Sequence, residues 1–101
     1  MTKKKRARPP IHPGEVLLEE FMKPLGLSAN KLGLDLRVPA NRILEIVKGE
    51  RSLSAGTALR LARYFGNSPD FWVNLQARYD LEKASDQLAE TIAREVNPRA
   101  A

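Results

Sequence analysis

The sequence predicts an all-α protein that folds as one compact five-helix bundle. Apolar residues recur at the three- and four-residue spacing of amphipathic helices along most of the chain. Serine, proline and glycine stand where such helices would begin and end. No segment before residue 83 alternates in the manner of a half-buried strand, and 101 residues suit a single domain.

Each predicted helix has its own start and stop signals. Pro13 can open the first helix, because its missing N–H is not needed in a first turn, and Pro24 with Gly26 ends it. Ser28, Ser54 and Ser68 are good N-caps for later helices. The expected helices span residues 13–23, 28–36, 39–48, 54–65 and 68–82. The side chains expected to face the core are Val16, Leu17, Phe21, Leu25, Leu32, Leu36, Ile43, Ile46, Val47, Ala58, Leu59, Leu61, Ala62, Phe65, Phe71, Trp72, Leu75 and Tyr79.

The excess positive charge lies at the N-terminus. Residues 1–11 form a predicted flexible arm with five basic residues and no acidic one, while the remaining 12 basic residues match the 12 acidic residues. Such an arm can follow DNA phosphates or enter a minor groove, or it can be a solvated terminus. The charge pattern leaves both interpretations open.

The C-terminal extension, residues 83–101, is compatible with two structures. Ala84, Leu88, Ile92 and Val96 fit a helical stripe, and Ile92 with Val96 would also share one side of a short strand. A further apolar stripe suggests a dimerisation element, and the alternative is that the extension folds back on its own core.

Composition excludes several classes. Cysteine is absent, so neither disulfides nor thiolate metal sites are possible. No apolar run approaches the ~18 residues of a membrane span, and the basic start leads into Pro9-Pro10 instead of a secretory signal. We therefore expect a cytoplasmic protein. His12, the only histidine, has no second metal ligand of its kind, and no catalytic set or phosphate loop is present. We expect no enzyme activity, no cofactor and no metal.

Residues 27–51 carry the most informative pattern, two short helices joined by a tight turn. The second begins Pro39-Ala40-Asn41-Arg42 and buries Ile43, Ile46 and Val47. The major groove of DNA admits one helix, and Asn or Arg can pair bidentately with adenine or guanine. The expected base-contacting residues are Ala40, Asn41, Arg42 and Glu45, of which Glu45 either accepts from a cytosine amine or, preferably, orients Arg42. The expected phosphate-contacting residues are Ser28, Asn30, Lys31, Lys48 and Arg51. This pattern predicts a DNA-binding regulator, associated with the nucleoid when bound.

Residues 12–82 resemble a known family of DNA-binding domains. Leu32, Leu36-Arg37-Val38, Ile43, Ile46 and Gly49 match the core and turn of the phage-repressor-like (lambda-repressor-like) helix-turn-helix. The sequences His12-Pro13-Gly14-Glu15, Glu19-Glu20-Phe21, Pro24 to Ser28, Thr57 to Gly66, Ser68-Pro69 and Trp72 to Ala77 resemble the HigA (VapI-like) antitoxins. The resemblance implies an antitoxin that binds a HigB-like, mRNA-cleaving toxin and, as a homodimer, double-stranded operator DNA in its own promoter. Because such toxins are typically basic, Glu15, Glu19 and Glu20 are the expected toxin-binding face.

The sequence departs from that family pattern at three positions. Arg37 stands where the family has glycine for a turn with positive φ, and Gly33 replaces an alanine within the helix. Ala29 replaces a glutamine that touches phosphate in the family. The departures at Arg37 and Ala29 leave room for one alternative, a protein-interaction module that has lost DNA binding. The other alternative is a stand-alone transcription regulator without a toxin partner.

Overall fold

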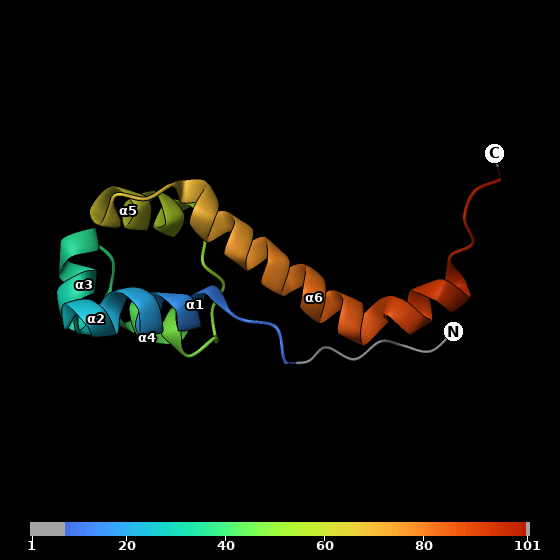
Figure 1. Ribbon diagram of the computed structural model, residues 1–101, viewed down its shortest axis with the longest axis horizontal. Helices are drawn as coiled ribbons and strands as arrows, with labels where there is room; N and C mark the ends of the chain where they lie inside the picture. Colours follow the sequence, from blue (N-terminus) through green and yellow to red (C-terminus); the bar gives the residue numbers. More distant parts are fainter. Residues whose placement is uncertain (1–7, 101) are drawn as a thin grey trace.

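Helices are the regular secondary structure of this protein throughout residues 8–100, the part of the chain that the computed structural model describes. The predicted all-α class is confirmed. In Figure 1 the shorter helices gather into a bundle at one end, and the last helix, α6, runs out from that bundle. Of the predicted basic arm, residues 1–7 lie outside the described residues, and residues 8–11 are not helical.

The first helix is continuous but changes its hydrogen-bond register. It comprises α1 (Pro13–Val16), the π-helical η1 (Leu17–Met22) and α2 (Lys23–Leu25), so it ends two residues later than predicted. Pro24 has no N–H to donate, and its ring crowds the carbonyl four residues back. Consistent with this, the preceding N–H of Lys23 donates to Leu18 O, five residues earlier. Gly26 then ends the helix with a left-handed φ of 63°.

The next three helices fall close to their predicted positions. They are α3 (Ala29–Leu36), α4 (Ala40–Val47) and α5 (Ala55–Phe65). Ser28 and Ser54 act as the predicted N-caps, their hydroxyl oxygens accepting from the N–H groups of Lys31 and Thr57. With the first helix counted as one and α6 added, the described residues form the predicted five helices.

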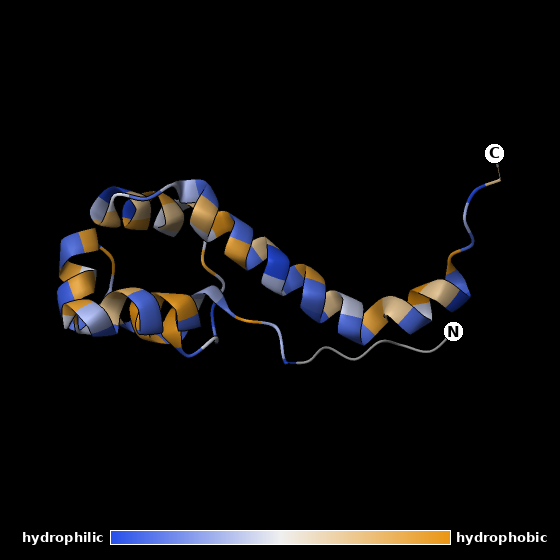
Figure 2. Cartoon of the chain, in the orientation of Figure 1, coloured by the Kyte–Doolittle hydropathy of each residue, from blue (hydrophilic) through white to orange (hydrophobic). Residues whose placement is uncertain are grey.

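The final helix is longer than the sequence indicated. α6 spans Pro69–Glu95, so it does not stop at Glu82, and the strand alternative for the extension is wrong. No glycine or proline interrupts residues 70–97, so nothing local breaks the helix before Pro98. Apolar residues continue along α6 beyond the bundle (Figure 2), among them Leu81, Leu88 and Ile92, which are all exposed. None of the described helices is both long enough and apolar enough to span a membrane.

The core joins all five helices. Leu17, Leu32, Ile43, Ile46, Leu61 and Trp72 are fully buried. The indole Nε1 of Trp72 donates to Asn67 Oδ1 at 3.0 Å, so its polar group keeps a partner. Most expected core residues are buried or half-buried, which confirms the helical periodicity.

Leu25 and Leu59 were wrongly assigned to the core and are 62% and 60% exposed. Leu25 follows the π-helical turn, whose extra residue shifts the later positions out of phase with a 3.6-residue repeat. Leu59 lies beside Arg60 and Arg63 on the solvent side of α5. The apolar face assigned to that helix was too broad. Tyr64 and Phe71, also expected to pack in the core, are 38% and 39% exposed, although the Tyr64 ring contacts Phe65 and the Phe71 ring contacts Phe21 and Trp72.

Two residues that end helices in the left-handed conformation give a paired stability test. Arg37 has φ 63°, where a Cβ costs about 1 kcal/mol, so Arg37→Gly should raise the free energy of unfolding by up to about that amount. Gly26 has the same φ with open space around its Cα, so Gly26→Ala should lower it by about 1 kcal/mol. Urea unfolding measures both. An unchanged Arg37→Gly variant would mean that the arginine side chain offsets its own strain.

Candidate nucleic-acid interface

α3 and α4 form a helix-turn-helix whose turn is unusually close. Arg37 ends α3 in the left-handed region, and the Val38 N–H donates back to Gly33 O at 3.0 Å. A Cβ on Gly33 would lie 2.8 Å from Val38 O, which explains why glycine stands inside α3. Arg37 therefore adopts a left-handed conformation, so the turn has the positive φ expected at this position and the arginine tolerates it.

α4 has one buried and one exposed side. Ile43 and Ile46 are fully buried, while Asn41, Leu44 and Lys48 are exposed. Positions 41, 44 and 48 are three, four and seven residues apart, so they share one face of the helix. Pro39 occupies the N-cap position with extended backbone and sets the direction in which α4 starts.

The start of the first helix packs against the buried side of α4. A Cβ on Gly14 would lie 1.8 Å from Ile46 O, so α1 and the backbone of α4 are in direct contact. Only glycine permits that approach. The side of α4 opposite α1 is therefore the side that is free to meet a ligand.

The structure distinguishes among the four expected base-contacting residues. Asn41 is exposed, whereas Ala40, Arg42 and Glu45 are half-buried. The carboxylate of Glu45 accepts from Arg51 Nε at 2.7 Å, so the contact observed for Glu45 is with Arg51 and not the expected one with Arg42. The sequence missed Leu44, although its three-residue spacing from Asn41 places it on the same face.

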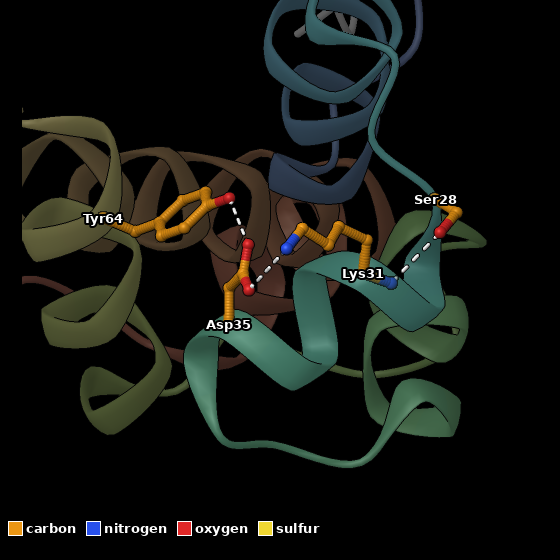
Figure 3. Close-up of polar contacts among 4 residues, drawn as sticks. All are labelled: Ser28, Lys31, Asp35 and Tyr64. Carbon is orange, nitrogen blue, oxygen red and sulfur yellow. Dashed lines mark hydrogen bonds and ion pairs between the residues drawn. The ribbon is translucent and has the colours of Figure 1, made fainter.

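The expected phosphate-contacting residues are all exposed, at the start of α3 and just after α4. They are Ser28, Asn30, Lys31, Lys48 and Arg51. Figure 3 shows that Ser28 caps α3 and that Lys31 Nζ lies 3.2 Å from Asp35 Oδ1. The hydroxyl of Tyr64 donates to the same carboxylate, which ties α3 to α5 and lowers the pKa of Asp35. Lys31 and Arg51 thus hold surface ion pairs, which cost little to exchange for a phosphate.

The loop between α4 and α5 is anchored by buried polar side chains from α6 and from the start of the first helix. The N–H of Leu53 donates to Gln76 Oε1 at 2.7 Å, and Gln76 Nε2 donates to Asp80 Oδ1 at 2.9 Å. From the other side, His12 Nδ1 accepts from Gly14 N–H at 2.9 Å, and the His12 ring also hydrogen-bonds the backbone of Arg51. The loop that carries Arg51 is therefore held to α1 and α6.

His12 has the structural role expected of it. It is the N-cap of α1, and its ring meets the Tyr79 ring edge-on at 4.8 Å. Burial lowers the pKa of His12 and outweighs the opposing effects of Asp80 and the Arg51 backbone. The imidazole is therefore neutral near pH 7, as its role as a hydrogen-bond acceptor requires.

The acidic residues expected to meet the toxin lie on the first helix. Glu15, Glu19 and Glu20 are all exposed, and Glu19 forms an ion pair with Lys23 at 2.7 Å. No group of three or more metal-ligating side chains occurs among residues 8–100.

Comparison with known proteins identifies this arrangement. A family model described as helix-turn-helix matches residues 18–72. The chain belongs to the helix-turn-helix family. It is 52% identical over 80 residues to virulence-associated protein I of Dichelobacter nodosus, covering 79% of this chain and 74% of that protein.

Solved structures of HigA proteins share the whole fold. An addiction module antidote protein of the HigA family from Coxiella burnetii is 47% identical, with a TM-score of 0.86 over 91% of this chain and 100% of that one. Antitoxin HigA of Pseudomonas aeruginosa, solved with the higBA promoter, is 41% identical, with a TM-score of 0.87 over 90% and 99% of the two chains. The resemblance to HigA antitoxins is therefore confirmed for this helix-turn-helix protein.

The anchoring role of Gln76 is testable by an isosteric substitution. Gln76→Leu should leave the buried Leu53 N–H without a partner and lower the free energy of unfolding by about 1–3 kcal/mol. Gln87→Leu, an exposed change on the same helix, is the control and should stay within about 0.5 kcal/mol. NMR hydrogen exchange at Leu53 checks the mechanism. An amide that stays protected in Gln76→Leu would show that another group anchors this loop.

Proposed function

We propose that this protein is an antitoxin that also represses its own promoter. It binds double-stranded operator DNA through α4 and a HigB-like mRNA-cleaving toxin through another surface, and it acts by binding alone, without a cofactor. The observation that carries the proposal is an exposed Asn41 at the start of α4, in a chain 41% identical to an antitoxin solved with its promoter. These activities place the protein in the bacterial cytoplasm.

In this proposal, the residues at the start of α4 recognise the DNA bases. The amide of Asn41 can pair with adenine N6 and N7, and the guanidinium of Arg42 can pair with guanine O6 and N7. Asn41 is directly exposed, while Arg42 is half-buried and reaches the groove from the flank of the helix. Ala40 lets the helix start approach the bases closely, and Glu45 holds Arg51 in place.

In this proposal, the affinity for DNA comes from the basic and polar residues near α4. Lys48 and Arg51 follow α4, and Ser28, Asn30 and Lys31 start α3, the helix that packs against α4. Contacts of this kind set register, and they make log K fall with log salt. Because Ala29 lacks a polar group, these residues supply the phosphate contacts at the start of α3.

The surface proposed for dimerisation is the projecting part of α6 with the residue that follows it. Leu81, Leu88 and Ile92 of α6 and Val96 just after it are between 46% and 71% exposed. Apolar side chains at this spacing can pair with the same surface of a second copy. A dimer would place two α4 helices in successive major grooves, about 34 Å apart.

Toxin neutralisation is assigned to occlusion of the toxin's RNA site. The exposed carboxylates Glu15, Glu19 and Glu20 complement a basic, RNA-cleaving enzyme. Copurification with the product of a neighbouring reading frame that encodes a basic protein separates this function from that of a stand-alone regulator.

The double variant Asn41→Ala/Arg42→Ala should lose sequence selectivity and keep weak, salt-sensitive binding to any duplex. The reason is that it removes base contacts, each worth about 1–3 kcal/mol, and leaves the phosphate contacts in place. Mobility-shift titration with DNA from upstream of the gene, with unrelated DNA as competitor, measures this.

The control for this experiment is Arg63→Ala/Asn74→Ala, which removes the same two residue types from exposed positions on α5 and α6. It should bind as the unaltered protein does. Retained selectivity in the α4 variant would show that another element reads the operator.

Removal of residues 84–101 should convert a dimer into a monomer, because it deletes most of the exposed apolar stripe and leaves Trp72 and Gln76 in place. Light scattering measures the mass. Leu88→Glu should act in the same direction in the full chain, whereas Gln87→Glu adds the same charge on a different face and should not. A truncated protein that remains dimeric would place the interface elsewhere.

A further inference from the structure

The exposed face of α4 contains an apolar side chain that the fold does not use. Leu44 is 41% exposed and does not belong to the core cluster of the described residues. Ile43 and Ile46 already provide the fully buried side of the helix. Leu44 instead shares its face with Asn41 and Lys48, at helical spacing.

The charged residues next to Leu44 on α4 do not cover its exposed side chain. Glu45 is turned to Arg51, with which it forms an ion pair at 2.7 Å. Arg42 is half-buried and lies three residues before Glu45, so both are on the same side of the helix. The outward face therefore presents an amide, a branched apolar group and an ammonium group in succession. Within a major groove, the apolar group that base edges offer is the C5-methyl of thymine.

We propose that Leu44 is a specificity-determining residue that contacts a thymine methyl in each half-site of the operator. This inference rests on the proposed DNA-binding function and adds a base identity to it. Leu44 lies three residues beyond Asn41, a rise of about 4.5 Å, so the thymine lies within about two base pairs of the base that Asn41 contacts. Cytosine at that position would lack the methyl and would bind less well.

The test uses the full-length protein and a duplex from upstream of its gene that shifts specifically. Each symmetry-related pair of thymines is replaced in turn by deoxyuridine, which removes only the methyl and keeps Watson–Crick pairing. At one pair of positions the unaltered protein should bind roughly fourfold more weakly for each methyl lost, the effect of one buried methyl-sized group. Leu44→Ala should bind the thymine and deoxyuridine duplexes equally at those positions.

The matched control is Leu59→Ala, the same change at an exposed leucine on α5, and it should keep the full sensitivity to deoxyuridine. Thermal melting confirms that both variants are folded. If the unaltered protein is indifferent to every replacement, or if Leu44→Ala keeps the sensitivity, the inference is wrong although specific DNA binding stands. If no duplex binds specifically, the proposed function fails and this inference fails with it.

Discussion

The burial of Ile43 and Ile46 against the start of the first helix is the constraint on which the rest of the structure depends. Gly14 brings that helix into contact with the backbone of α4, and a single added Cβ would be 1.8 Å from Ile46 O. A helix as short as α4 has little stability by itself, so its position comes from this packing. With one side held in the core, Asn41, Leu44 and Lys48 necessarily face outward.

The loop after α4 is held by residues from two other helices. His12, the N-cap of α1, hydrogen-bonds the backbone of Arg51, and Gln76 of α6 accepts a hydrogen bond from the Leu53 N–H. The loop after α4 is thus held between the first helix and the helix proposed to dimerise. Because buried hydrogen bonds are costly to leave unmade, these contacts fix the position of the loop relative to α6.

The turn between α3 and α4 combines one strained residue with one close approach of the backbone. Arg37 accepts the left-handed conformation in spite of its Cβ, while Gly33 provides the close approach that the turn needs. Strain at one position and fit at the other are small compared with the burial of Leu32, Leu36 and Ile43 on either side. The packing of the core therefore sets the backbone conformation of the turn, and the turn residues adopt that conformation.

The sequence by itself determined the helical class, the caps, the helix-turn-helix and the outward position of Asn41, because all of these follow from local spacing and local hydrogen bonds. It misplaced Leu25, since the π-helical turn before Pro24 changes the phase of the helix in a way that a regular 3.6-residue pattern does not contain. Its own pattern left the helix and strand alternatives open for residues 84–96. Only the tertiary structure decided that Glu45 pairs with Arg51, that Gln76 anchors Leu53 and that Leu44 is exposed on the outward face of α4. Those features depend on how the loop after α4 and the other helices lie around α4, and helical periodicity describes each helix alone.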